Sequence, residues 1–108
     1  MRNLAKFEII GRVGSIQANG NVTHLKLAAN YRRKEGDNWT DDTYWNRVTV
    51  FGEGTRKYIS DKLNVGDLVR AAGRMRDTSY EKDGQTIYAT DRVVDEFGIL
   101  ASKAGNDE

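Results

Sequence analysis

The sequence predicts an all-β domain, a five-stranded Greek-key barrel with one helix between the third and fourth strands. Segments rich in β-branched and aromatic residues recur along the 108-residue chain, and turn signals such as Asp83-Gly84 separate them. One segment has apolar residues at helical spacing, and it lies between the third and fourth of these strand segments. The length suits a single hydrophobic core, and the sequence contains neither an internal repeat nor a low-complexity segment.

The first two strands are predicted to form a hairpin. Residues Lys6–Gly14 (KFEIIGRVG) are rich in β-branched and aromatic side chains, and we expect this strand to break at its last glycine. Residues Asn21–Ala29 (NVTHLKLAA) alternate, with leucines on one face. The Asn-Gly-Asn sequence at Asn19–Asn21 is a strong hairpin signal.

A long polar stretch separates this hairpin from the third strand. Residues Asn30–Asp42 are charged and polar, and they indicate an exposed loop. The third strand is predicted at Thr43–Phe51 (TYWNRVTVF). The helix follows, with Thr55 as its N-cap and Gly66 as its stop signal.

The last two strands are predicted at Asp67–Arg76 (DLVRAAGRMR) and Gln85–Val94 (QTIYATDRVV). Five strands with one helix between the third and fourth is the order of an OB-fold, a partly open Greek-key barrel. We expect residues 1–101 to form this domain, and residues 102–108 to form a short, flexible, polar C-terminus.

Composition narrows the classes of protein and ligand. The chain has no cysteine, which excludes disulfides and thiolate metal sites. It shows no apolar leader and no run near the about 20 apolar residues that a membrane span needs, so we expect a cytoplasmic protein without membrane contact. Residues 1–80 hold 14 Lys and Arg against 9 Asp and Glu, whereas residues 81–108 hold 3 against 7. A basic body with an acidic end favours a polyanionic ligand.

The third strand has two different faces. Val48 and Val50 alternate with Trp45 and Arg47, and Phe51 continues the second set. An arginine between two aromatic rings cannot be buried without a partner, because removing a guanidinium from water costs several kcal/mol. The second set therefore faces a groove or solvent, where two large aromatic rings are unusual unless a ligand covers them.

Further aromatic and cationic side chains are predicted on the same surface. Aromatic rings stack on bases whatever the sequence, and Lys and Arg neutralise phosphates, so the mixture is typical of a site for unpaired nucleic acid. A duplex hides its base faces, which favours a single strand. The candidate residues are Tyr31, Arg32, Arg33, Lys34, Trp39, Trp45, Arg47, Phe51, Arg74, Arg76 and Tyr80.

Four motifs of this sequence resemble those of the bacterial single-stranded DNA-binding protein (SSB) family. They are KFEIIGRVG, YWNRVTVFGEG, NVGDLVRAAGRMR and DGQTIYATDRVVDEFGIL, and the resemblance covers roughly residues 4–100. It implies an OB-fold, usually a homotetramer and otherwise a dimer, that binds single-stranded DNA without sequence preference in replication, recombination or repair. It also implies a location at the nucleoid.

The resemblance assigns roles to individual residues. Trp45 and Phe51 take the positions of base-stacking aromatics, with Arg47 between them. Tyr80 takes the place of the hairpin aromatic that is often Trp, and Tyr31 or a neighbour takes that of the loop aromatic. Trp39 is included from its chemistry alone. In many members the first strand pairs between subunits, which would account for the apolar residues on both of its faces: Phe7, Ile9 and Ile10.

The sequence also departs from the family pattern. Typical members continue through a flexible linker to an acidic tip that docks repair and replication proteins, whereas this chain stops at SKAGNDE. We therefore expect a tail-less or truncated member that does not recruit partners in this way. Tyr80 in place of Trp, and Asn64-Val65 where many members carry basic residues, predict somewhat weaker binding.

Two other binding functions remain open, an RNA-binding OB-fold and a protein-binding OB module of the primosome type. An enzyme is not expected. His24 is the single histidine, and no cysteine or tight carboxylate cluster accompanies it, so we predict neither a metal site nor a cofactor. The glycine pairs at Gly11–Gly14 and Gly52–Gly54 are too short for a nucleotide-binding fingerprint.

Overall fold

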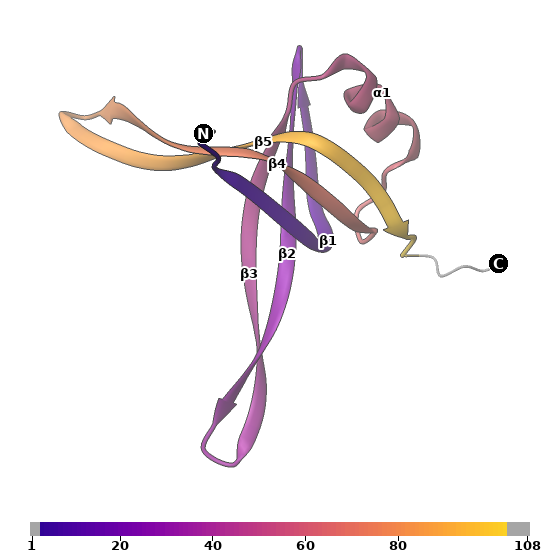
Figure 1. The fold of residues 1–108 in the computed structure, drawn as a ribbon, viewed down its shortest axis with the longest axis vertical. Helices are drawn as coiled ribbons and strands as arrows, with labels where there is room; N and C mark the ends of the chain where they lie inside the picture. Colours follow the sequence, from indigo (N-terminus) through magenta and orange to yellow (C-terminus); the bar gives the residue numbers. More distant parts are fainter. Residues whose placement is uncertain (1–2, 104–108) are drawn as a thin grey trace.

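The computed structural model describes residues 3–103 of the chain. Five strands form a closed barrel in the order β1-β2-β3-β5-β4, and one helix lies between β3 and β4 in the sequence (Figure 1). The predicted fold class is therefore confirmed. The elements are β1 (Lys6–Asn19), β2 (Val22–Glu35), β3 (Asn38–Val50), α1 (Glu53–Lys62), β4 (Leu68–Lys82) and β5 (Gln85–Ala101).

The strand β1 pairs with both β2 and β4, and this closes one side of the barrel. Residues Lys6–Arg12 pair with β4, and residues Arg12–Asn19 pair with β2. The register of the β1–β2 pair shifts between Val13 and Ser15, so Gly14 lies at a β-bulge. The predicted end of the strand at Gly14 is therefore wrong: the glycine bends the strand, which continues to Asn19.

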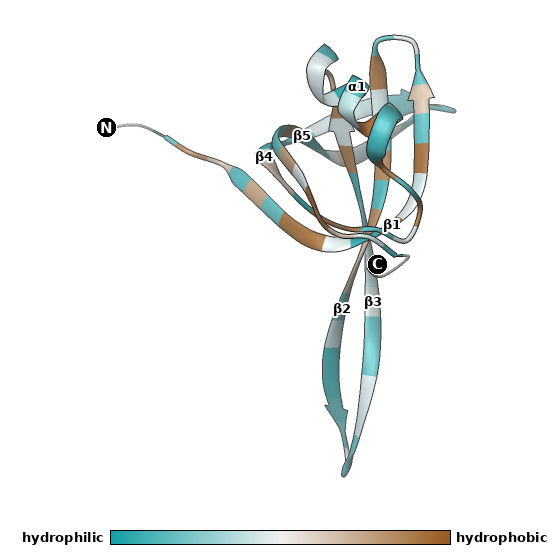
Figure 2. Ribbon diagram, turned by 90° about the vertical axis from the view of Figure 1, so that its right-hand side faces the viewer, coloured by the Kyte–Doolittle hydropathy of each residue, from teal (hydrophilic) through white to brown (hydrophobic). Residues whose placement is uncertain are grey.

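The predicted loop at residues 30–42 is instead the outer half of a long hairpin. The β2–β3 ladder runs without a break from the Thr23–Val50 pair to the Glu35–Asn38 pair. The hairpin projects away from the barrel in Figure 1, and its outer half is coloured hydrophilic in Figure 2. Strands outside the barrel have both faces in water, so they lack the apolar alternation from which a strand is predicted.

The helix α1 begins three residues earlier than predicted. Its N-cap is Gly52, and the Arg56 N–H donates to the Gly52 carbonyl at 2.9 Å. Thr55 lies inside the first turn, so its predicted role as N-cap is wrong. Ile59 and Leu63 are buried and pack the helix against the barrel.

Side chains at alternate positions of the strands point inward and fill the barrel. Val48 and Val50 are fully buried, as the alternation on the third strand predicts. Leu25 and Leu27 of β2 and Val69 of β4 are fully buried as well. This packing fixes the outward direction of the residues between them.

The end of the domain is tied to the loop before β4. Asp67 is buried, and its carboxylate accepts hydrogen bonds from the backbone N–H groups of Asn64 at 2.9 Å and Lys103 at 3.0 Å. Most of the C-terminus that we expected to be flexible, residues 104–108, lies outside the described residues. Across residues 3–103, no helix has the length and apolar character required to cross a membrane.

Candidate nucleic-acid interface

Trp45 and Arg47 lie on the open face of β3, opposite the buried valines. The Trp45 side chain is 58% exposed, and Arg47 is exposed as well. In the β2–β3 ladder Trp45 is paired with Ala28, and Arg47 is paired with Lys26. Directly opposed residues of an antiparallel pair project to the same face, so Lys26 adds a second cation beside Arg47.

The same face continues along the β2–β3 hairpin beyond the barrel. Arg32 is paired with Asp41 and Lys34 with Trp39, and side-chain alternation places both pairs on the face of Trp45. The Arg32 guanidinium carbon lies 4.9 Å from the ring centre of Trp39, a cation–π contact. The hairpin therefore extends the surface of Trp45 by one more exposed ring and two more cations.

Tyr31 and Arg33 lie on the other face of this hairpin, so the structure does not bring them together with Trp45. The Tyr31 ring centre is 5.3 Å from that of Tyr44. Arg33 forms ion pairs with Asp42 at 2.7 Å and Glu35 at 3.3 Å. Hydrogen bonding to Asp42 raises the pKa of Arg33 above its ordinary value.

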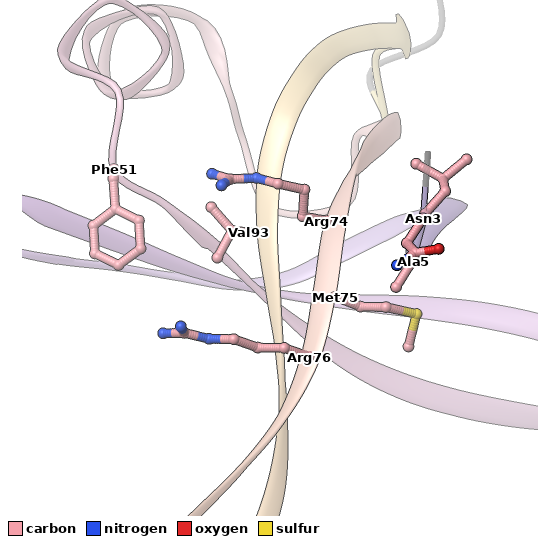
Figure 3. Close-up of a pocket in the computed structure, with 8 residues that line it drawn as sticks. Asn3, Ala5, Phe51, Arg74, Met75, Arg76 and Val93 are labelled. Carbon is pink, nitrogen blue, oxygen red and sulfur yellow. The ribbon is translucent and has the colours of Figure 1, made fainter. Parts of the chain in front are cut away.

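Phe51, Arg74 and Arg76 meet beside β5. Phe51 is 55% exposed and follows directly after the end of β3. In Figure 3 both arginines extend from β4 toward Phe51 and Val93, whereas Met75 points the opposite way. They border a cavity of about 520 Å³. The residues that line it are Asn3, Leu4, Ala5, Phe51, Arg74, Met75, Arg76 and Val93.

A second, smaller cavity of about 130 Å³ adjoins the first and brings Arg47 to the same place. The two cavities share Phe51, Arg76 and Val93, and together they are called the Phe51 groove below. The residues that line the second cavity are His24, Arg47, Thr49, Phe51, Arg76, Asp91 and Val93. Three arginines from two strands therefore surround one exposed ring.

Two carboxylates compete with any anionic ligand of the Phe51 groove. Asp91 Oδ2 lies 3.7 Å from Arg76 Nε, and Asp95 Oδ2 lies 3.6 Å from Arg74 Nε. Exposed ion pairs of this kind contribute only about 0–1 kcal/mol. A phosphate can therefore replace either carboxylate at low cost.

His24 is a partner of Thr49 in this region. Its Nδ1 lies 3.1 Å from the Thr49 hydroxyl, and Thr49 is buried where β3 pairs with β5. Within residues 3–103, three or more His, Cys, Asp or Glu side chains nowhere gather in a group that could hold a metal ion.

The β4–β5 hairpin presents one tyrosine on each face. Tyr80 is paired with Ile87, and alternation places it on the face of Arg76 and of the Phe51 groove. Tyr88 is paired with Ser79, on the opposite face, and is 79% exposed. Tyr80 is exposed too, so its ring is available to a ligand that leaves the groove along the hairpin.

Sequence reasoning missed Lys26 and Asp91 at the candidate site, and it did not identify Tyr44 and Tyr88 as exposed rings outside it. Tyr44 and Tyr88 are exposed, although each belongs to a strand that enters the barrel. The turn at Asp83-Gly84 was identified, and counting pairs outward from it would have placed Tyr88 opposite Ser79. Nothing in the local sequence of Asp91 indicates that it lines the same cavity as Arg47, because this arrangement depends on the closure of the barrel.

The apolar residues of β1 divide between the core and the surface. Phe7 is buried in the core, and Ile9 packs against it. Ile10 is 53% exposed on the outer face, where it is paired with Arg70. Arg70 is bonded to Glu8 and Glu96 on this face, and the hydrogen bond to Glu8 raises its pKa above the ordinary value.

Comparison with known proteins places this geometry in context. The single-stranded DNA-binding protein of Malacoplasma penetrans is 32% identical over 94% of this chain, and single-stranded DNA-binding protein 2 of Streptococcus agalactiae is 32% identical over 77%. The chain spans 54% and 62% of the lengths of these two curated relatives.

The solved structures agree on the fold. The structure described as the Plasmodium falciparum SSB complex with ssDNA matches with a TM-score of 0.79 at 22% identity, covering 93% of this chain and 97% of that chain. Residues 4–100 match the Single-strand binding protein family, which is nearly all of the described chain. This protein therefore belongs to the Single-strand binding protein family.

Proposed function

We propose that the chain binds single-stranded DNA without sequence preference, through the face of Trp45 and the Phe51 groove. The observation that carries the proposal is the exposure of two large aromatic rings, Trp45 and Phe51, beside arginines of two different strands. Membership of the family supports it, as do relatives named single-stranded DNA-binding proteins. The same membership favours a binding protein over an enzyme.

The chemistry of each part matches one feature of an unpaired strand. Every base has a flat π-face, so stacking on an aromatic ring contributes roughly 1–3 kcal/mol per base whatever its identity. The arginines and lysines bind phosphates and release counterions. In a duplex the base faces are covered by their neighbours, so the rings would find no partner.

The path that we propose for the strand follows the shared face. It starts on the outer half of the β2–β3 hairpin, crosses Trp45 and Arg47, enters the Phe51 groove and leaves along Tyr80. Tyr31 and Arg33 lie on the other face of the hairpin, so they contact DNA only where the strand passes around the hairpin tip. The residues on the main path are Lys26, Arg32, Lys34, Trp39, Trp45, Arg47, Phe51, Arg74, Arg76 and Tyr80.

Alanine substitution of the two rings tests the proposal. We expect Trp45→Ala and Phe51→Ala each to weaken binding of a dye-labelled dT oligomer by about 1–3 kcal/mol, because each removes one stacking platform. Tyr88→Ala is the matched control, since it removes an exposed ring from the opposite face of the β4–β5 hairpin. Unchanged affinity in both the Trp45→Ala and the Phe51→Ala variant, with the barrel still folded, would refute the proposed site.

Competition experiments separate this function from the other two that the sequence left open. Tighter binding of an RNA oligomer than of the matched DNA oligomer would assign an RNA-binding function. Negligible binding of single-stranded DNA even at low salt would indicate a protein-binding module. We expect the DNA oligomer to bind more tightly than both the RNA oligomer and the matched duplex.

The proposal includes self-association, into a homotetramer or a dimer, through the outer face of β1. The exposure of Ile10 on that face supports this, because a large aliphatic side chain in the middle of a strand is covered when strands of two subunits meet. We also propose a role in replication, recombination or repair, and a location at the nucleoid.

A further inference from the structure

We propose that Gly14 is a positioning residue for Trp45, and that it acts by leaving room for the indole on the surface of β1. A Cβ atom built on Gly14 would lie 2.3 Å from Cζ3 and 2.8 Å from Cη2 of Trp45. Such distances are far below van der Waals contact. The six-membered ring of the indole therefore occupies the space that any other residue at position 14 would need.

The register explains how a ring from β3 reaches β1. Trp45 is paired with Ala28 of β2, and on the other side of β2 Ala28 is paired with Arg12 of β1. Gly14 is the unpaired residue of the β1 bulge, between the Val13–Leu27 and Ser15–Lys26 pairs. The indole thus crosses over a small residue of β2 and ends above the bulge. A bulge of this kind changes the direction of side chains around it.

The backbone conformation gives no separate reason for glycine at this position. The glycines with positive φ in the described chain are Gly20, Gly36, Gly66 and Gly84, so the φ of Gly14 is one that any residue adopts. The requirement for glycine at position 14 therefore comes from the indole and not from the turn of the chain.

Support from the sheet at Gly14 prepares the indole ring of Trp45 for stacking. One side of the indole is held against the sheet, while 58% of the residue stays exposed to a base. An unsupported side chain at this exposure would lose rotamer freedom when a base stacks on it, which opposes binding. A ring already held in one place avoids this loss, so Gly14 raises affinity without touching DNA. This inference rests on the stacking role of Trp45 in the proposed function.

A double-mutant cycle tests the inference. We expect Gly14→Ala to weaken binding of a dye-labelled dT oligomer by about 2- to 10-fold, the cost of ordering one side chain. In a Trp45→Ala background the same change should have no effect, because there is no ring to displace. Gly98→Ala is the matched control: Gly98 is also a strand glycine without positive φ, and a Cβ there would meet nothing within 4 Å.

Two further measurements distinguish positioning from general damage to the barrel. In a Trp39→Phe background Trp45 is the single tryptophan, and Gly14→Ala should change the wavelength and anisotropy of its emission before DNA is added. Trp45→Phe should rescue Gly14→Ala, so that the double variant binds as tightly as Trp45→Phe alone, since the shorter ring lacks the atoms that reach position 14.

The outcomes separate the two claims. Equal loss from Gly14→Ala with and without Trp45, or unchanged affinity and emission, would overturn the positioning role. If Trp45→Ala leaves affinity unchanged, the stacking role in the proposed function fails, and the positioning role fails with it. A loss from Trp45→Ala together with no loss from Gly14→Ala would overturn only the inference about Gly14.

Discussion

Asp91 is an acidic side chain in the cationic part of the candidate site. Its carboxylate lies 3.7 Å from Arg76 and lines the same cavity as Arg47 and Phe51. A phosphate that approaches the groove must displace this carboxylate from Arg76 and meets its negative charge. For the proposed phosphate ligand, Asp91 therefore lowers the affinity of the groove.

Removing the charge of Asp91 should strengthen binding. We expect Asp91→Asn to increase the affinity for a dT oligomer about two- to fivefold at low salt, the range of one exposed charge pair, with the gain shrinking as salt screens it. Asp61→Asn is the control, because it makes the same charge change in an ion pair of α1 with Lys57. Equal gains in both variants would indicate a general effect of net charge.

Phosphate contacts made by the arginines of the groove should be measurable in the salt dependence of binding. Replacing Arg74 by Gln is expected to flatten the slope of log affinity against log salt by about 0.7, the value for one phosphate contact on a single strand. Arg70→Gln serves as the control on the same strand, since Arg70 is bonded to Glu8 and Glu96 on the outer face. An unaltered slope for Arg74→Gln would remove it from the site.

At the scale of elements, the β2–β3 hairpin combines a barrel wall with a projecting arm. Its inner half carries Leu25, Leu27, Val48 and Val50 into the core. Its outer half contributes no core residue, and it is held by its own ladder and by contacts such as the ion pair of Arg33 with Asp42. The inner half therefore combines core residues with the proposed contacts of Trp45 and Arg47, whereas the outer half carries proposed contacts alone.

Shortening this hairpin should separate the two roles. Replacing residues 32–41 by Asn-Gly would join the paired residues Tyr31 and Asp42 through a two-residue turn. The melting temperature should stay within a few degrees because the core is intact, as checked by circular dichroism. Affinity for long single strands should fall. The salt slope should flatten by up to about 1.4, because two of the three cations that are removed, Arg32 and Lys34, lie on the face of Trp45. A collapse of the fold would show that the arm supports the barrel.

At the scale of the whole molecule, the two projecting hairpins and Ile10 lie at different places on the barrel. The hairpins extend in different directions from the barrel in Figure 1. Ile10 lies on the outer face with Arg70, apart from the residues that line the Phe51 groove. Ile10 itself therefore lines neither cavity of the Phe51 groove.

The proposed self-association has its own test. We expect Ile10→Asp to lower the mass measured by light scattering, because removing a carboxylate from water at a contact between subunits opposes that contact. Val65→Asp is the control, as it places the same charge at an exposed aliphatic residue of the α1–β4 connection. An unchanged mass for Ile10→Asp would exclude this face as the contact.

Much of this molecule could be predicted from its sequence. The alternation of Val48 and Val50 with Trp45 and Arg47 decided both the core face and the open face of β3, because strand periodicity is local. The order of the five strands and the helix along the sequence likewise predicted the five-stranded barrel. The lengths of the strands were wrong where both faces are polar, as in residues 30–42, and the helix start was missed because glycine at the N-cap carries no side-chain signal.

The sequence alone determined which side chains are available for stacking and for phosphate binding, since these are properties of residue type and alternation. The tertiary structure decided which of them meet. Closure of the barrel at Thr49 and Val93 brings Arg47, Arg76 and Asp91 around Phe51, although they are far apart in the chain. The bulge at Gly14 sets the indole of Trp45 over β1. Such contacts depend on register and closure between strands, which no local pattern encodes.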